Sequence, residues 1–219
     1  MKKYFYILWL FLAGCASKAV QADLPKPSVL LGATSAQALR VRASSGPATF
    51  AQRFEFRNGD WVPLEKAFPV SVGTRGTITK SKKKEGDKRT PEGQYFFMEA
   101  FSRDEQSSLR LPVQKITEQD KWIDDPEHKD YNRWVRGPTT AKSYEELWRK
   151  DPLYDLFLVT DFNTNPATPY QGSAIFIHRW RDQSYGTAGC VAMDKDRLQE
   201  LAEWLDPKLK PVILIGETK

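Results

Sequence analysis

Short runs of strand-forming residues, separated by turn residues, recur along this chain of 219 residues. From about residue 38 the apolar residues alternate with the period of a strand. Asn58-Gly59 is typical of a tight hairpin, because both residues tolerate a positive φ. Two apolar runs, 156–162 and 174–178, are rich in aromatic and β-branched residues and short enough to be buried strands. We therefore expect an α+β fold that is mainly β, with a few helices.

Two helices are expected in the C-terminal half. The segment 194–205 places its apolar residues on one helical face, with acidic residues at its start and Pro207 after its end. Ser143 and Glu146 have the spacing of a capping box, which predicts a short helix over 143–150. A last strand is expected over 211–216.

The segment from about Phe101 to Pro138 has weak periodicity and is dense in Asp, Glu, Lys and Trp. We interpret it as an insertion or long loop that lies over the sheet, and long ordered loops are commonly functional. The chain shows no internal repeat, and 40% of its residues are hydrophobic and 28% charged. A single domain over residues 35–219 is therefore expected.

The N-terminus has the pattern of an export signal. Lys2 and Lys3 form a positive region, and the apolar stretch 4–13 is too short to span a bilayer. The stretch ends in Leu12-Ala13-Gly14-Cys15, which resembles the lipobox of bacterial lipoproteins, in which the cysteine is lipidated.

This pattern predicts a signal peptide over residues 1–14, followed by a lipidated Cys15 and a tether over 15–34. The alternative is an ordinary signal peptide, in which Cys15 is incidental and lost on cleavage. A membrane anchor would place the domain on the periplasmic face of the cell envelope, and Ala16 after the cysteine favours the outer membrane.

The charge is only mildly basic. The formal net charge is +5, and removal of Lys2 and Lys3 from the 33 basic residues leaves 31 against 28 acidic ones, or +3. This excess fits approach to an acidic polymer such as the cell wall, and nothing in the chain resembles a nucleic-acid reader.

Cys190 is the one cysteine left after Cys15 is set aside. An unpaired thiol in an oxidising compartment is a liability unless it is buried or chemically used. His178 precedes it by twelve residues, at the end of an expected strand, so the imidazole could meet the thiol and activate it. Gly186 and Gly189 would let backbone N–H groups approach a ligand.

Two plainer interpretations stay open at this point: Cys190 as a small buried apolar residue, and His178 as a hydrogen-bonded histidine at a strand end. A metal centre is disfavoured, because one free cysteine and two histidines fall short of the ligands that zinc needs.

The segment HRWRDQSYGTAGCVAM, residues 178–193, resembles the active-site signature of the L,D-transpeptidases with a YkuD-type catalytic domain. In that signature an upstream histidine precedes a Ser/Thr-x-Gly-Cys-Val element. The segment KEGDKRTPEGQYFF, residues 84–97, is similar to a second stretch of the same family. Within it, Thr90 to Gly93 also has the composition of a turn initiated by proline and finished by glycine.

The resemblance implies a β-sandwich-like catalytic domain that needs no cofactor. It implies that Cys190 is the nucleophile and His178 the general base, and that Gly189 and Cys190 donate to the oxyanion. In such enzymes the cysteine attacks the carbonyl of the L-centre third residue of a peptidoglycan stem peptide. The terminal D-alanine leaves, and the acyl group passes to an amine of a second stem. Thr187 and Gly186 are then expected to contact substrate.

The chain departs from the family pattern at two positions: Ala188 and Ala192 stand where many members have a second histidine and an arginine. Either another cation holds the substrate carboxylate, for which the candidates are Arg179, Arg181 and the lysines of 80–84, or the substrate differs. The group that orients the histidine also stays open between Asp155, Asp161 and a backbone carbonyl.

Two alternatives to the transpeptidase remain. One is an L,D-carboxypeptidase, or another hydrolase of wall-linked peptides, with the same Cys/His site. The other is a non-catalytic wall-binding lipoprotein. The sequence predicts no oligomeric state.

Overall fold

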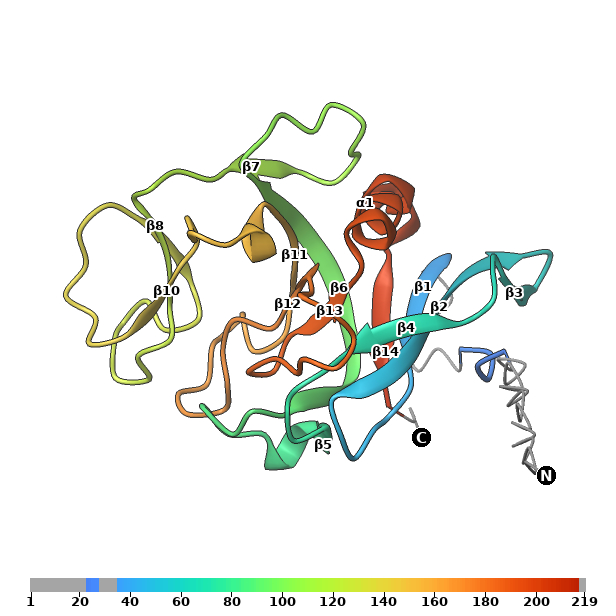
Figure 1. Ribbon diagram of the computed structural model, residues 1–219, viewed down its shortest axis with the longest axis horizontal. Coiled ribbons are helices and arrows are strands. Elements are labelled where there is room, and N and C mark those ends of the chain that lie inside the picture. Colours follow the sequence, from blue (N-terminus) through green and yellow to red (C-terminus); the bar gives the residue numbers. More distant parts are fainter. Residues whose placement is uncertain (1–22, 28–34, 217–219) are drawn as a thin grey trace, which may run out of the picture.

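The computed structural model describes residues 23–27 and 35–216 (Figure 1). Its strands are β1 Gln37–Val41, β2 Ala48–Arg57, β3 Asp60–Pro63, β4 Phe68–Ser71, β5 Thr77–Thr79, β6 Thr90–Ser102, β7 Val113–Lys115, β8 Asp120–Ile123, β9 Trp134–Arg136, β10 Tyr144–Glu146, β11 Leu156–Thr160, β12 Phe176–Arg179, β13 Val191–Met193 and β14 Val212–Ile215. The helices are α1 Lys195–Trp204 and the 3-10 turns η1 Lys80–Lys82, η2 Pro152–Tyr154 and η3 Pro207–Leu209.

The large sheet runs in the order β1-β14-β6-β11-β12-β13-β4-β2, and β2 also pairs with β1. This last pairing closes the path of strands, so the core is barrel-like and its strands have no free edge along the ring. Strand β3 continues the sheet outward from β2 as a hairpin. The expectation of a mainly β domain is confirmed.

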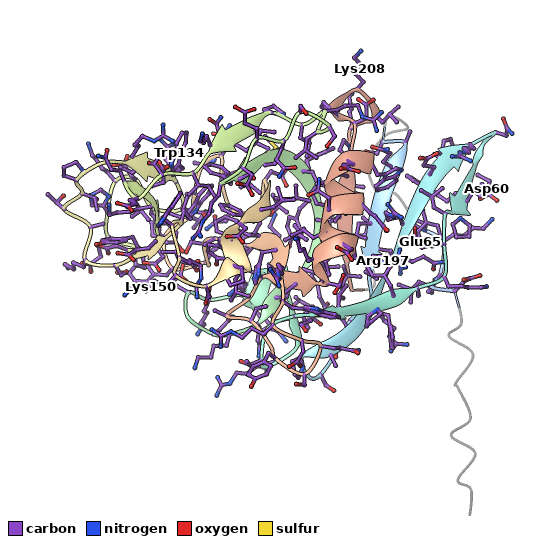
Figure 2. All side chains as sticks on the ribbon, turned by 45° about the horizontal axis from the view of Figure 1, so that its top comes forward. Asp60, Glu65, Trp134, Lys150, Arg197 and Lys208 are labelled. Atoms are coloured by element: carbon purple, nitrogen blue, oxygen red, sulfur yellow. The ribbon has the colours of Figure 1, made fainter. Side chains whose placement is uncertain are left out.

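The predicted hairpin at Asn58-Gly59 is confirmed. Arg57 pairs with Asp60, and the two residues between them have φ of 51° and 83°. Positive φ at both central positions defines the turn type whose twist matches the flanking strands. The hairpin lies at the end of the molecule that carries Asp60 and Glu65, opposite the end with Trp134 and Lys150 (Figure 2).

The two apolar runs form β11 and β12, and both strands are buried on both faces. On one face Leu158 and Ile177 join the main core with the apolar side of α1. On the other face Phe157 and Phe176 join a second, aromatic-rich cluster. Burial on both faces explains why these runs are continuously apolar rather than alternating.

Helix α1 begins where it was expected. The Asp194 side chain accepts a hydrogen bond from the Asp196 N–H at 2.9 Å, which caps the first turn. Leu198, Leu201 and Ala202 are buried against the barrel, so the helix is held by one apolar face.

The predicted helix over 143–150 is wrong. Residues Tyr144–Glu146 form β10, which pairs antiparallel with β8, and Glu145 lies opposite Trp122. Burial alternates along the segment: Leu147 is fully buried, whereas Tyr144 is exposed. This period of two belongs to a strand, and tertiary pairing with β8 outweighs the local capping pattern.

The middle segment is more regular than a long loop. Within it β8 and β9 pair with each other, and β10 completes a three-stranded sheet. Figure 1 places β8 and β10 on the far side of β11 and β12 from β1–β3. Trp122 and Trp134 bring their rings against Phe101 of β6, with centroids 6.2 and 5.2 Å apart. The small sheet is thus anchored on the aromatic face of the barrel.

The expected turn at Thr90 to Gly93 is also absent. Thr90 begins β6, and residues 90–92 pair in parallel with β5. The segment 69–79 supplies parts of β4 and β5, which pair with other strands rather than with each other. Proline is accommodated because it lies at the second residue of a long strand.

Residues 23–27 fall in the segment expected to be a tether, and they lie against the barrel. Leu24 is buried, and its N–H donates to the Gln52 side chain at 2.7 Å. The predicted signal peptide, Cys15 and the remainder of the tether lie outside the described residues. Within the described ranges, no helix has the length and apolar character needed to cross a membrane.

Candidate functional site

Cys190 lies at the end of a turn that leads into β13. Its side chain belongs to the aromatic-rich cluster between the barrel and the small sheet, and the residue is 5% exposed. Cys190 also lines two cavities, one of about 290 Å³ and one of about 170 Å³. The residue is therefore buried but borders both cavities.

The thiol of Cys190 has its own hydrogen-bond partners. Sγ donates to the Ala174 carbonyl at 3.1 Å and accepts from the Phe176 N–H at 3.4 Å. Burial raises the pKa of Cys190 to about 12, and the negative charge of Glu145 adds to the rise. At neutral pH the group is a thiol, and it becomes a nucleophile only when a base takes its proton.

His178 lies on β12, opposite Ala192 of β13 in the parallel register. Its Nδ1 is 2.7 Å from the Arg179 carbonyl oxygen. Because a carbonyl only accepts, Nδ1 must carry the proton, and Nε2 keeps its lone pair. Burial lowers the pKa of His178 to about 4, so the ring is neutral at pH 7 and Nε2 can act as a base.

Of the three candidates for the group that orients His178, the structure selects the backbone carbonyl. Asp161 instead accepts from the Phe96 N–H at 2.8 Å, and Asp155 pairs with Arg103 at 3.2 Å. The Tyr154 ring also meets the imidazole edge to face, with centroids 5.2 Å apart. A carbonyl and an aromatic ring fix the tautomer and the plane of the imidazole.

Two threonine hydroxyls hold the backbone of Cys190. Thr187 Oγ1 donates to the Cys190 carbonyl at 2.7 Å and accepts from the Gly189 N–H at 3.0 Å. Thr90 Oγ1 donates to the same carbonyl at 3.3 Å and accepts from the Gly73 N–H at 2.8 Å. The two motifs singled out in the sequence, about a hundred residues apart, thus meet at the main chain of the cysteine.

Gly189 has a φ of 154°, and a Cβ at this position would be 3.1 Å from both the Arg89 carbonyl oxygen and the Ile175 side chain. Its N–H, expected to donate to an oxyanion, is bonded to Thr187 Oγ1 in this structure. Gly186 approaches a neighbouring chain segment, because a Cβ there would be 2.7 Å from Thr74 Cα. Gly186 is thus required by close backbone approach, and Gly189 is favoured by its positive φ.

Cys190 and His178 both line the larger cavity, together with Thr187, Gly186 and Arg181. It also contains Arg149, which the sequence reasoning missed. Arg149 and Arg181 bind the same carboxylate, that of Asp151, at 2.7 and 3.3 Å. The cavity is therefore lined by two arginines that share one carboxylate, with Glu145 on the same lining.

Arg179 and the lysine cluster lie elsewhere. Strand alternation turns Arg179 to the face of β12 opposite His178, on the side of Ile177 and the main core. Of the lysines in 80–84, Lys83 lines the smaller cavity and is 5% exposed. Its ammonium group binds Asp87 at 2.6 Å.

The smaller cavity has an acidic lining, from Glu85, Asp124 and Glu145, with Lys83 and Ser173 beside them. Glu145 borders both cavities, as Cys190 does. Its Oε2 accepts from the Tyr154 hydroxyl at 2.5 Å. The two cavities thus differ in the charged residues that line them and share Cys190 and Glu145.

Glu145, Arg149 and Tyr154 are the site residues that sequence reasoning missed. Glu145 and Arg149 fall at alternate positions of one segment with Leu147 between them, so an inward face of period two was present. The signal was masked because two of the three inward residues are charged, and hydrophobic periodicity fails where a strand lines a polar site.

The site combines a neutral thiol and a neutral imidazole on the lining of one cavity, together with Arg149 and Arg181. In the part of the chain that the structure describes, no hydrogen bond joins Cys190 Sγ to the His178 ring. The sulfur points its proton at Ala174 instead. Catalytic hydrogen bonds are often formed only when substrate is bound, and a thiol paired with an imidazole base is one arrangement used in nucleophilic catalysis.

The family model of the YkuD L,D-transpeptidase catalytic domain matches residues 48–214. The crystal structure of the helical cell shape determining protein Pgp2 from Campylobacter jejuni is similar to 84% of this chain, with a TM-score of 0.43 and 17% identity. The chain spans about half of that protein, 48% of its length. The comparison with curated protein sequences found no match. The chain belongs to the YkuD family of L,D-transpeptidase catalytic domains.

Proposed function

We propose that this chain is a cell-envelope L,D-transpeptidase that forms a thioester at Cys190 with a peptidoglycan stem peptide and transfers the acyl group to an amine. The observation that carries the proposal is that Cys190 and His178 line one cavity of about 290 Å³, together with Arg149 and Arg181. The family membership supports the reaction class.

In the proposed acylation, the sulfur turns its proton from the Ala174 carbonyl to Nε2 of His178. Sγ then attacks the carbonyl carbon of the third residue of the donor stem, and a C–S bond forms. The imidazolium returns the proton to the leaving amine of the terminal D-alanine as the peptide bond breaks. The neutral resting pair means that the proton moves during the attack rather than before it.

The developing oxyanion is proposed to accept from the N–H groups of Gly189 and Cys190. The Gly189 N–H must then exchange its Thr187 partner for the oxyanion. Arg149 and Arg181 are proposed to hold the carboxylate of the donor stem, in place of the arginine that Ala192 replaces. Each would exchange part of its contact with Asp151 for the substrate.

The proposal extends to the part of the chain outside the described residues. Residues 1–14 act as a signal peptide, and a lipid on Cys15 anchors the domain over residues 35–219 at the envelope, on the periplasmic face. Incorporation of labelled fatty acid that Cys15→Ser abolishes would support this anchor. Export of both the wild-type protein and Cys15→Ser without a lipid would contradict it.

Incubation with a tetrapeptide muropeptide, followed by mass analysis of the products and of the intact protein, tests the activity. A cross-linked product and a thioester adduct on Cys190, both absent with Cys190→Ala, are expected. Tripeptide alone would support the carboxypeptidase instead. A wild-type chain that never acquires an adduct, even from a carbapenem, would favour the non-catalytic wall-binding protein.

A further inference from the structure

The smaller cavity is also lined by Cys190, but His178 is not among its lining residues. A thioester at Cys190 with its acyl chain in the larger cavity would leave the smaller one beside the sulfur. Transfer needs a second reactant to reach the same carbon. The smaller cavity supplies a separate space for it.

Glu145 is held at the junction of the two cavities. Strand β10 fixes its backbone opposite Trp122 of β8, and the Tyr154 hydroxyl donates to Oε2 at 2.5 Å. This hydrogen bond uses one carboxylate oxygen and leaves Oε1 for another donor. Tyr154 is itself buried between Phe157 and Phe176, so the carboxylate cannot swing freely.

The carboxylates of the smaller cavity are not neutralised by its own lysine. Lys83 is committed to Asp87 at 2.6 Å and to the Lys84 carbonyl at 3.0 Å. Asp124 Oδ1 is buried and has no hydrogen-bond partner among the described residues. A buried carboxylate oxygen without a donor is costly, and a ligand that brings N–H groups and positive charge would satisfy it.

The arrangement does not suit a metal ion. Across residues 23–27 and 35–216, no three His, Cys, Asp or Glu side chains are grouped as a metal site requires. The oxygens that remain for a ligand, on Asp124 and Glu145, suit the several N–H donors of one ammonium group.

Resting on the transpeptidase function proposed above, we propose that the smaller cavity binds the ammonium group of the acyl acceptor and that Glu145 takes a proton from it. The ligand class is a primary amine carried on a second stem peptide, protonated in solution. His178 serves the donor side and Glu145 the acceptor side of the same sulfur.

The step balances as follows. The ammonium gives one proton to the Glu145 carboxylate and becomes a neutral amine, whose nitrogen attacks the thioester carbonyl. The C–N bond forms and the C–S bond breaks. The second proton leaves nitrogen for the departing sulfur, which regenerates the Cys190 thiol, and Glu145 then loses its proton to water. The products are a neutral amide, a neutral thiol and the original carboxylate.

Burial raises the pKa of Glu145 above its ordinary value. A carboxylate that binds protons more tightly is a stronger base, so the shift makes proton capture from an ammonium easier. The same negative charge also raises the pKa of Cys190, which makes the sulfur hold its returned proton.

Glu145→Gln tests the inference, with Glu146→Gln as the matched control on the same strand, where the side chain is exposed. Each chain is mixed with a tetrapeptide donor and Nα-acetyl-lysine amide as acceptor. Intact mass follows the acyl-enzyme, and product analysis gives the ratio of amide to hydrolysed tripeptide. Thermal unfolding checks that each variant is folded.

Glu145→Gln is expected to acylate at least as fast as wild type, because the amide removes a charge that opposes thiolate formation. Its ratio of amide to hydrolysis is expected to fall about a hundredfold, the contribution of a general base. Glu146→Gln should match wild type in both measurements. An unchanged ratio with Glu145→Gln, an equal fall with Glu146→Gln, or a wild type that yields only hydrolysis would overturn the inference.

Binding to a chain that cannot react separates this inference from the proposed function. On a Cys190→Ala background, titration with Nα-acetyl-lysine amide is expected to show binding that Glu145→Gln weakens about tenfold. The Nε-acetylated analogue, which has no charge, should bind neither chain. If wild type forms no acyl-enzyme, the proposed function fails, whereas equal binding with and without Glu145 overturns the ammonium site.

Discussion

Replacing Thr90 by valine removes a hydroxyl that joins two parts of the site while keeping the shape of the side chain. Thr90 is fully buried, and its Oγ1 accepts from the Gly73 N–H at 2.8 Å. Without that oxygen the N–H has no acceptor, and an unsatisfied buried donor costs about 1–3 kcal/mol. The Cys190 carbonyl loses a weaker bond of 3.3 Å but keeps Thr187 at 2.7 Å.

We therefore expect Thr90→Val to lower the free energy of unfolding by about 2 kcal/mol. Urea unfolding followed by fluorescence measures this, with an unchanged m-value as the sign that only stability has changed. Thr90→Ser is the control, because it keeps the hydroxyl and loses only a methyl group, which costs about 1 kcal/mol.

The double variant Thr90→Val with Thr187→Val provides the sharper test. Each single change leaves the Cys190 carbonyl with one hydroxyl donor, and the double change leaves it with neither. The combined loss should exceed the sum of the single losses by about 1 kcal/mol. Strict additivity, or a Thr90→Val chain as stable as wild type, would refute the reasoning from these contacts.

Three further predictions concern the buried ionisable groups. The pKa of His178 falls from 6.5 unfolded to about 4 folded, so the stability that its neutral form contributes is present above pH 6.5 and lost as the pH falls towards 4. Urea unfolding at pH 7 and pH 4 should show about 3 kcal/mol of loss that His178→Gln does not show. Cys190, with a pKa of about 12, should react with iodoacetamide at pH 7 at least about a hundredfold more slowly than free cysteine, with a rate that rises to pH 10 without a plateau; a plateau below pH 9 would speak against a neutral resting thiol. Asp87→Asn leaves the buried Lys83 ammonium group without its 2.6 Å partner and should cost about 3–5 kcal/mol in denaturant unfolding, more than the double change Lys83→Met with Asp87→Leu; a costlier double change would show that packing, not charge, dominates there.

The elements that sequence predicted correctly are those whose apolar residues decide the structure. Helix α1 and the strands β11 and β12 bury one or two apolar faces, and the hairpin at Asn58-Gly59 depends on two residues that tolerate positive φ. In each case local preference and tertiary packing point to the same structure.

The predictions failed where local and tertiary preferences disagree. Ser143 and Glu146 have the spacing of a helix cap, but pairing with β8 makes the segment a strand. Thr90 to Gly93 has the composition of a turn, but pairing with β5 extends it. Cross-strand partners far away in sequence leave no local trace in a single chain.

The family motifs indicated Cys190, His178 and Thr187 as candidate site residues, and all three line one cavity in the structure. Their roles remain proposals. Arg179 was an equally reasonable candidate by sequence, since only the alternation of β12 separates its face from that of His178. Arg149 was out of reach because its segment was interpreted as a helix, whose faces repeat differently from those of a strand.

The walls around the sulfur come from two separate stretches of polypeptide. Strands of the barrel and the turn before β13 provide Cys190 and His178, whereas the segment that carries β10 provides Glu145 and Arg149. A chimera that carries a relative's segment in place of residues 113–151 would therefore keep Cys190 and His178 and exchange Glu145 and Arg149. Such a chimera is expected to take on the donor and acceptor preference of the relative while it keeps the Cys190 and His178 pair of this chain.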